Sequence, residues 1–468
     1  MAESDSIVRI TGWAVADGAG FAARPGAVLV RTGRGQDGGP TLSLLAAGTP
    51  REVDDHPARV GAVTIDRPGA VLIPGLVNAH THLDLTHIGP RPLPPGPARF
   101  TAFAEVVRQG RLTDAAGIGA SVRRGVELSL AGGTVAVGDI AGAVGGRAST
   151  LAGAALADAA GPCGLSGVSY VEFFGLGPAR RRALDLALET LESLNDRGGV
   201  RFGLQPHAPY SVAADVYLEA AQGAVQRGVP WCTHLAESPE ERALVSEGGG
   251  PLREFLERIG VWDAASAEGF GQGRTPVAHL RATLTWLSSA LRAAERGLPA
   301  PMAVHVNDAS DADIAVLAGC NACVAYCPRS SAYFGVHETF GPHRYRDMLG
   351  AGINVCLGTD SIVNLPAEAA GPEGGGMSVL DEVRLLRRRD GTDTRTLLAM
   401  ATVNGAAALG LETTAFLFGS VPGLTRPVVG GRPIAGVVAA PAAADATDAF
   451  EAVALGRGRA ELLAAGAI

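Results

Sequence analysis

Two histidines placed two positions apart, His80 and His82, are the first residues of this 468-residue chain whose type and spacing indicate chemistry. They follow an apolar run that begins at Val71 and has the character of a buried β-strand. Side chains at positions i and i+2 of a strand point to the same side, so both imidazoles can face one point. Neutral imidazole is a zinc ligand, although a single His-x-His pair is equally well explained as two satisfied polar residues.

More titratable residues stand at or just past the ends of other strand-like segments. They are His207, His234, Glu237, His305 and Asp360. A fold that gathers the ends of its strands would bring these residues together, although they are far apart in sequence. Several imidazoles and carboxylates converging on one point are ligands of the kind that bind zinc or iron. We therefore predict a metal centre.

The elements that must position these residues alternate along the chain. Apolar strand-like segments are followed by helical windows, which is typical of repeated βα units and a parallel sheet. The strands are expected at 71–78, 134–140, 166–174, 201–206, 230–235, 302–306, 322–327 and 353–358, and the helical windows include 179–195, 213–227, 240–259, 281–296 and 311–318. Eight units predict an α/β fold, the (β/α)8 or TIM barrel. The alternative, an open doubly wound sheet, would carry a glycine-rich phosphate turn where this chain has His80 and His82.

Both ends of the chain lie outside this alternation. Residues 1–73 have short alternating strands between Gly-rich and Pro-rich turns, and residues 408–468 return to apolar runs. We expect the two ends to form one small β-sandwich domain beside a barrel that spans residues 74–407. Pro-rich and Gly-rich loops would lie on the barrel face that carries active sites, as lids or channel walls, at 92–100, 261–276 and 366–376.

Composition excludes several classes of function. The chain has 39 basic and 47 acidic residues, a formal net charge of −8 and no long basic run, so we expect no nucleic-acid partner. No apolar run is long enough for a membrane span, and the acidic start lacks the pattern of a signal peptide, so we expect a cytoplasmic enzyme with no membrane partner. Six cysteines are too sparse for a disulfide framework. Every basic residue is arginine, which excludes chemistry that needs a lysine.

Five segments resemble the motifs of the amidohydrolase superfamily, and more narrowly its branch of deaminases and chlorohydrolases. In chain order they are Gly75-Leu-Val-Asn-Ala-His80-Thr-His82-Leu, Gln205-Pro-His207-Ala-Pro-Tyr210-Ser, Thr233-His234-Leu-Ala-Glu237-Ser, Val304-His305-Val-Asn and Leu357-Gly-Thr-Asp360-Ser. The resemblance covers about residues 70 to 410. It is highly specific for the superfamily and far less specific for the substrate.

The resemblance implies that His80, His82, His234 and Asp360 hold one divalent metal ion, zinc or alternatively iron. The absence of lysine agrees with a single ion, because two-metal members commonly bridge their ions through a carbamylated lysine. Three neutral imidazoles and one carboxylate leave such an ion positively charged, and this charge lowers the pKa of a bound water toward neutrality.

The resemblance also assigns catalytic roles. Glu237 would carry protons to a ring nitrogen and then to the leaving group, with a structural role beside the metal as the alternative. His305 would polarise or orient the attacking hydroxide together with Asp360, which would serve both as metal ligand and as proton acceptor. His207 would contact the substrate, with a polar residue that orients its loop as the alternative. Tyr210 is a weaker candidate for substrate contact.

The function implied is that of a metal-dependent hydrolase. We expect a deaminase that replaces an exocyclic amine of an N-heterocycle (a purine, an adenosine-type nucleoside or a pyrimidine) by a carbonyl and releases ammonia. The alternatives are hydrolysis of a cyclic amide or a carbon–halogen bond, and an inactive barrel that binds a metabolite. The expected partner is a small-molecule substrate, and the relatives suggest a homo-oligomer, a dimer or larger.

Arg329, which follows the seventh strand, has two interpretations. It could bind a carboxylate or phosphate on the substrate through its planar guanidinium, which would suit a carboxylate-bearing nucleoside such as aminodeoxyfutalosine. It could equally be a structural ion-pair partner. The nearby Cys320, Cys323 and Cys327 lack a fourth ligand at a fitting distance, so they are expected to be small buried residues rather than a zinc site.

The remaining titratable residues carry weaker expectations. Four of them could support the metal ligands, although capping and exposed positions are the commoner outcome, namely Asp84, His87, Asp139 and Glu172. His56, His337 and His343 are expected at the surface. His279 lies in a segment, Thr275-Pro-Val-Ala-His279-Leu, that resembles one bordering the substrate channel in relatives.

Overall fold

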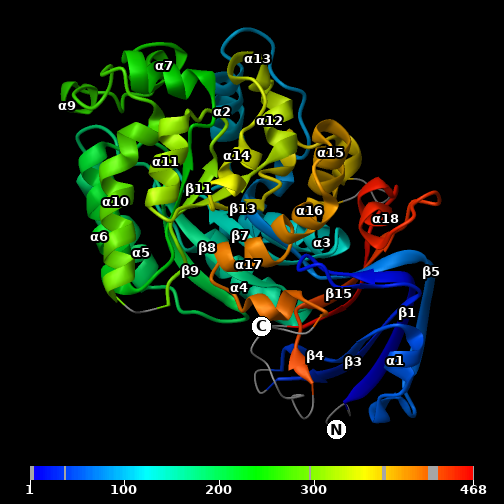
Figure 1. Cartoon of the computed structure of the whole chain (residues 1–468). Coiled ribbons are helices and arrows are strands. Elements are labelled where there is room, and N and C mark those ends of the chain that lie inside the picture. The colour runs from blue at the N-terminus through cyan, green and yellow to red at the C-terminus, as the bar shows by residue number, and fades with distance from the viewer. Residues whose placement is uncertain (1–4, 36–37, 295–296, 371–375, 420–430, 467–468) are drawn as a thin grey trace.

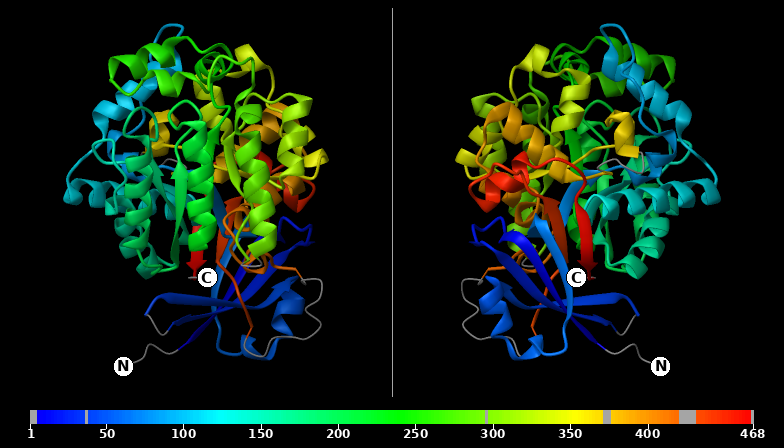
Figure 2. Two further views of the ribbon diagram at one scale, coloured as in Figure 1. Left: turned by 90° about the vertical axis from the view of Figure 1, so that its left-hand side faces the viewer. Right: turned by 90° about the vertical axis from the view of Figure 1, so that its right-hand side faces the viewer.

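The structure is a computed structural model, and it describes residues 5–35, 38–294, 297–370, 376–419 and 431–466. An α/β part with helices on its outside lies above a mixed β-sheet in Figures 1 and 2. No helix within the described ranges is both long and apolar enough to cross a bilayer.

Eight parallel strands make the α/β part, counted over the described residues. They pair in two sheets, with the orders β6-β7-β8-β9 and β10-β11-β12-β13. Isolated parallel bridges connect the sheets at both edges, from Leu204 to Trp231 and from Thr81 to Asp360. The strands are β6 (Leu76–Thr81), β7 (Thr134–Ala141), β8 (Ser166–Phe173), β9 (Val200–Pro206), β10 (Cys232–Leu235), β11 (Met302–His305), β12 (Cys323–Tyr326) and β13 (Asn354–Leu357). The curled sheets are consistent with the predicted barrel.

Burial explains the composition of these strands. Every residue of β7 and β8 is buried, since helices cover one face and the centre of the ring lies on the other. Parallel strands buried on both faces are rich in small and β-branched residues, as Val135, Val137 and Ile140 are in β7. The sequence therefore has continuous apolar runs here rather than an alternation.

Helices connect and surround the strands (Figure 1). They are α2 (Arg99–Gly110), α3 (Ala115–Ala131), α4 (Leu151–Ala160), α5 (Arg180–Glu192), α6 (Ala214–Arg227), α7 (Pro239–Glu247), α8 (Pro251–Arg258), α9 (Ala264–Ala267), α10 (Pro276–Ala294), α11 (Asp311–Gly319), α12 (Pro328–Phe334), α13 (His337–Phe340), α14 (Tyr345–Gly350), α15 (Val379–Asp390), α16 (Thr394–Met400) and α17 (Val403–Ala408). The single helix expected at 240–259 is two helices, α7 and α8. Gly248 ends α7 in the left-handed conformation, with φ +74°, and glycine adopts this conformation without steric cost.

The first barrel strand differs from the prediction. The run at 71–78 contains the end of β5 (Val63–Pro74) and the start of β6. At the break between them, a Cβ added to Gly75 would lie 2.3 Å from a methyl carbon of Val135, so a larger residue would collide with the neighbouring strand. The apolar run hides this break because both strands are buried.

Strands from both ends of the chain share the mixed sheet. Its order is β14-β4-β3-β1-β5-β15-β16, and β2 pairs with β1. The strands are β1 (Ser6–Ala16), β2 (Ala22–Ala23), β3 (Gly26–Arg34), β4 (Pro40–Gly48), β14 (Arg432–Pro433), β15 (Gly436–Pro441) and β16 (Glu461–Ala465), with the short helices α1 (Pro50–Asp54) and α18 (Ala449–Leu455) beside them. One apolar cluster joins Ile10 and Val28 to Ile434 and Val437. The sandwich form and the boundaries at residues 73/74 and 407/408 stay predictions.

Candidate active site

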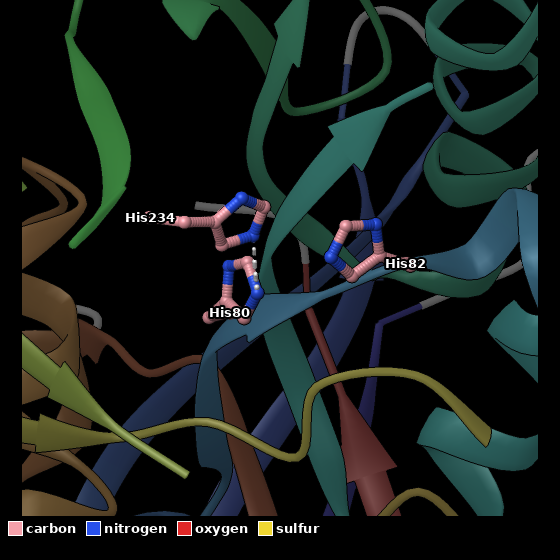
Figure 3. A group of neighbouring side chains, drawn as sticks. All are labelled: His80, His82 and His234. Atoms are coloured by element: carbon pink, nitrogen blue, oxygen red, sulfur yellow. Dashed lines mark hydrogen bonds between the residues drawn. The ribbon is translucent and has the colours of Figure 1, made fainter. Parts of the chain in front are cut away.

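Three imidazoles meet where β6 and β10 end (Figure 3). Nε2 of His80 and Nε2 of His234 are 3.3 Å apart. The ring of His82 lies 5.0 Å from that of His80 and 5.4 Å from that of His234, between ring centres. One ligand atom from each of these three buried histidines lies within 4.8 Å of the others. The structure thus brings together the three histidines that the sequence singles out.

Asp360, just past β13, adds a carboxylate to this cluster. Its Oδ1 is 3.7 Å from His80 Nε2 and 3.5 Å from His82 Nε2. Although burial alone raises the pKa of a carboxyl group, the neighbouring His80, His305 and His82 hold the pKa of Asp360 well below its usual value. Asp360 is therefore an ionised ligand candidate.

Backbone geometry around the cluster is unusual. Four non-glycine residues at the ends of strands have positive φ angles, namely Ala236 (53°), His305 (74°), Val306 (49°) and Asp360 (58°). Such conformations are costly for residues with a Cβ and gather at functional sites. Two hydrogen bonds between the Asn78 amide and Thr359, one at the backbone N–H and one at the hydroxyl, hold the segment that carries Asp360 against β6.

The residues present fit a divalent metal ion. Nδ1 of His80 and Nδ1 of His82 are buried and have no hydrogen-bond partner among the described residues. The Gln205 amide lies 3.3 Å from Nδ1 of His234, which leaves Nε2 of that ring directed at His80. Burial lowers the pKa of His82 to about 3 and that of His234 well below its usual value, so these rings are neutral and can donate lone pairs to a metal.

Glu237 follows β10 and is held by its own loop. Its backbone N–H donates to Oε2 of the buried Glu241 at 2.7 Å, and its carbonyl accepts a hydrogen bond of 2.9 Å from the Asn307 amide. The Glu237 carboxylate is 3.3 Å from Nε2 of His305. Burial raises the pKa of Glu237 well above its usual value, and the nearby Asp360 adds to this shift. A carboxyl group with a raised pKa can both give and take a proton near neutral pH.

His305 lies at the end of β11, and its ring centre is 5.5 Å from those of His80 and His234. Burial lowers its pKa to about 3, so it is neutral. His343 contacts the backbone carbonyl of His305. The Tyr345 backbone N–H donates to Nδ1 of His343 at 3.0 Å, so the opposite nitrogen of that ring can donate to the His305 carbonyl at 2.9 Å. This contact fixes two successive residues with positive φ angles, His305 and Val306.

A cavity of about 930 Å³ opens onto the cluster and is bordered by His82, His234, Glu237 and Asp360. Apolar side chains from the helices above line much of it, including Phe100 and Phe103 of α2 and Phe255 of α8. Pockets of this kind, with few polar groups converging at the base, hold small molecules. His207 and Tyr210 also border the cavity.

Residues 71–415 match the amidohydrolase family. The chain belongs to the amidohydrolase family. Its sequence is 30% identical over 406 residues to the aminodeoxyfutalosine deaminase of Deinococcus radiodurans, an alignment that covers 85% of this amidohydrolase and 84% of the relative. It is 27% identical over 377 residues to the 5-methylthioadenosine/S-adenosylhomocysteine deaminase of Haloarcula marismortui, covering 77% and 73% of the two chains.

Solved structures show the same fold. The amidohydrolase superposes on Helicobacter pylori aminofutalosine deaminase in complex with methylthio-coformycin with a TM-score of 0.70, at 18% identity and over 98% and 99% of the two chains. It superposes on the zinc complex of atrazine chlorohydrolase from Arthrobacter aurescens with a TM-score of 0.66, at 19% identity and over 96% and 91%. This amidohydrolase is a hydrolytic enzyme that acts on carbon–nitrogen bonds.

Arg329 lies elsewhere in the amidohydrolase than the substrate-binding interpretation requires. Its guanidinium donates to Glu382 and to the Ser378 carbonyl, and it is not among the residues that border the cavity. The structure therefore supports the ion-pair alternative. Buried Glu382 on α15 attracts the guanidinium and also accepts the Arg329 backbone N–H at 2.9 Å, so both the side chain and the backbone of Arg329 are held by Glu382.

Two further expectations need correction, and others are confirmed. His343 is half-buried rather than a free surface residue, since its ring stacks on Tyr326 with 3.7 Å between ring centres and bonds the His305 carbonyl. His279 is not among the residues that border the cavity, and its ring stacks against Phe270 instead. His337 is exposed and His56 partly exposed. The three cysteines at 320, 323 and 327 are buried free thiols, as predicted.

The sequence analysis did not predict a buried ion network beside the histidine cluster. Arg111, which directly follows α2, donates to Asp84 at 2.8 Å and to Glu172 at 3.1 Å. Asp139 is buried nearby, and its Oδ1 accepts the Leu83 backbone N–H at 2.9 Å. The two buried acids next to an arginine could be found only by knowing which strand ends lie side by side. His87 is exposed and joins α2 to the loop after β6 through the Gly110 carbonyl, at 2.8 Å.

Two of the three loops expected on the active-site face of the barrel contribute residues to the cavity border. Residue 100 at the end of the first loop and residue 261 at the start of the second both border the cavity. Residues 371–375 of the third loop lie outside the described residues.

Proposed function

We propose that this amidohydrolase is a deaminase of adenosine-type nucleosides. The observation that carries the proposal is the placement of Glu237, whose carboxyl group borders the cavity and touches His305 beside the cluster of His80, His82 and His234. A proton carrier next to a nucleophile site is what hydrolysis of an amidine-like ring carbon needs. The relatives named as deaminases of adenine nucleosides support this class of substrate.

We further propose that one divalent ion, zinc, is held by His80, His82, His234 and Asp360. When bound, it supplies a water whose pKa is lowered and which can attack the ring carbon. The zinc complex of the structurally similar atrazine chlorohydrolase, and the nitrogen and oxygen donors of this cluster, support the choice of metal.

The side chains then have separate tasks. Glu237 gives a proton to the ring nitrogen next to the amine-bearing carbon, which makes that carbon electrophilic. It then takes a proton from the attacking oxygen and delivers it to the amine. Asp360 takes the second proton of the attacking water, so the carbon–nitrogen bond breaks, ammonia leaves and the ring keeps a carbonyl. The proton held by Asp360 then returns to Glu237 and restores its acid form. His305 and Asp360 orient the attacking water, and His207 contacts the ring from the side of the cavity.

Within this class we favour nucleosides with an anionic group away from the adenine. Three exposed arginines, Arg108, Arg147 and Arg182, border the cavity and form its rim. Arg111 also borders the cavity, but it is mostly buried and already paired with Asp84 and Glu172. An anionic substituent would be attracted to this rim, as the carboxylate of aminodeoxyfutalosine would be. This role falls to arginines that the sequence analysis did not single out, and not to Arg329 as predicted.

Ammonia release by the purified, zinc-loaded enzyme tests the proposal. The panel contains adenosine, 5′-methylthioadenosine, S-adenosylhomocysteine, aminodeoxyfutalosine, cytosine and atrazine, and mass spectrometry identifies each product. We expect ammonia and the corresponding inosine-type product from one or more of the adenine nucleosides. Chloride release from atrazine without ammonia from any nucleoside would contradict the proposal.

Homo-oligomer formation, cytoplasmic location and the lack of a nucleic-acid partner stay predictions.

A further inference from the structure

Glu172, near the end of β8, is a buried carboxylate with one oxygen engaged and the other free. Oε2 accepts hydrogen bonds from Arg111 Nη2 and from the Ala143 backbone N–H, each at 3.1 Å. Oε1 has no hydrogen-bond partner among the described residues, although the side chain is 0% exposed. Leaving such an oxygen unpaired is costly, so a donor is needed here when the site is filled.

Glu172, which carries this free oxygen, lies beside the cavity and the metal cluster. Glu172 borders the cavity together with His207 and His234. Its Oε1 is 3.8 Å from Nε2 of His207, and the His207 ring centre is 5.0 Å from that of His234. One imidazole thus separates Glu172 from a metal ligand. A heterocycle whose reacting carbon lies at the cluster would direct its far edge, or the first group attached there, toward Glu172.

The chemistry of Glu172 restricts what it can bind. Although burial opposes ionisation, Arg111 and, more weakly, His207 and His82 keep the pKa of its carboxyl group below the usual value. An ionised carboxylate accepts hydrogen bonds and donates none. It attracts O–H or N–H donors and repels anionic groups, so the anionic end of a substrate must lie elsewhere in the cavity.

We infer that Oε1 of Glu172 accepts a hydrogen bond from a sugar hydroxyl of the nucleoside substrate, and that this contact selects nucleosides over free bases. The inference rests on the proposed function. A free base or a triazine carries no hydroxyl at this position, so it would leave the carboxylate oxygen unpaired. A site built around a buried polar partner rejects ligands that lack the matching group.

The test compares adenosine with 2′-deoxyadenosine and 3′-deoxyadenosine in the zinc-loaded wild type and in Glu172→Gln. In the wild type, loss of the contacted hydroxyl should lower kcat/KM by roughly 10- to 100-fold, as expected for a hydrogen bond to a charged group. In Glu172→Gln, the ratio of kcat/KM for adenosine to kcat/KM for the deoxyadenosine should be within a few-fold of one. The same comparison with inosine and its deoxy forms as competitive inhibitors measures binding without turnover.

Asp84→Asn is the matched control. Asp84 shares the Arg111 guanidinium with Glu172 but does not border the cavity. If Glu172 acted only by holding Arg111, Asp84→Asn would erase the preference for hydroxyl-bearing substrates as well. We expect the preference to survive in Asp84→Asn, even if overall activity falls.

Failure of the inference and failure of the proposed function give different results. Ammonia release from nucleosides with an unchanged hydroxyl preference in Glu172→Gln, or equal rates on adenine and adenosine in the wild type, would overturn the role of Glu172 alone. No ammonia from any adenine nucleoside would overturn the proposed function. If Glu172→Gln does not fold, Glu172→Asp is the second variant. It keeps the charge but is one methylene shorter, so its carboxylate is farther from the substrate, and the preference for hydroxyl-bearing nucleosides should again be reduced.

Discussion

The hydroxyl of Ser330 donates a hydrogen bond of 2.7 Å to Oδ2 of Asp360, while Oδ1 of the same carboxylate faces His80 and His82. Ser330 lies in the first turn of α12, whose start is fixed by Glu382 through the Arg329 backbone. The ligand candidate is therefore oriented by a helix that itself contributes no ligand. Partners of this kind commonly determine how well a metal is held.

Ser330→Ala should weaken zinc binding by about 10- to 100-fold, because Asp360 loses the donor that fixes its rotamer. Competition with a chromogenic chelator measures the affinity. Ser331→Ala is the control, since Ser331 donates instead to Asn307, at 2.6 Å, and leaves Asp360 untouched. Equal zinc affinity in Ser330→Ala and the wild type would contradict this role.

Metal binding and proton transfer should separate in two variants. His82→Ala removes a ligand, so both zinc content and turnover should be lost. Glu237→Gln keeps the shape of the side chain but cannot carry a proton, so zinc content should stay and kcat should fall by roughly 100- to 10,000-fold. Elemental analysis and steady-state kinetics measure the two effects. Retained turnover in Glu237→Gln would refute the proton-carrier role.

His279 should make stability depend on pH. Burial lowers its pKa to about 4 from an ordinary value of 6.5, and neither ring nitrogen has a hydrogen-bond partner among the described residues. Between pH 6.5 and pH 4 the unfolded chain binds a proton that the folded chain does not. Above pH 6.5 His279 is neutral in both states and does not lower the free energy of unfolding. As the pH falls from 6.5 to 4, the free energy of unfolding decreases by up to about 3 kcal/mol, because only the unfolded chain binds the proton.

His279→Phe keeps the stacking on Phe270 and removes this titration. Urea unfolding at several pH values should show the variant gaining stability relative to the wild type as the pH falls below 6.5. The exposed His337 offers a control, because His337→Gln should follow the wild type. If the free energy of unfolding depends on pH in the same way in His279→Phe and the wild type, the His279 ring is not the source of the pH dependence.

The arginine rim should matter only for charged substrates. Arg147 is exposed and borders the cavity. Arg147→Ala should lower kcat/KM for aminodeoxyfutalosine by about 2- to 5-fold, the range of an exposed ion pair, and leave adenosine unaffected. The effect on the charged substrate should shrink as salt is raised. An equal loss on both substrates would indicate a general structural role for this loop.

The sequence was sufficient to predict residues whose spacing follows the backbone. His80 lies in β6 and His82 directly follows that strand, and His234, His305 and Asp360 stand at or just past strand ends that a ring of parallel strands must bring together. The continuous apolar runs located seven of the eight strands of the ring. The first was misplaced because the end of β5 and β6 are equally buried and only Gly75 separates them.

Contacts that depend on which loops meet could not be predicted. Arg111 reaches Asp84 and Glu172 across different loops, and nothing in its own sequence neighbourhood marks it as buried. The same limit explains Arg329, whose partner Glu382 lies on a later helix. A side chain's charge was visible, but the identity of its counter-ion depended on the tertiary structure.

The bridge between Thr81 and Asp360 joins parts of the polypeptide that are synthesised far apart in time. A nascent chain that has emerged as far as His234 already carries three imidazoles, but its carboxylate ligand and the edge that seals β6 have not yet been translated. Zinc captured at that stage would be held incompletely and exposed to exchange. The complete set of four candidate ligands therefore exists only after translation has passed residue 360.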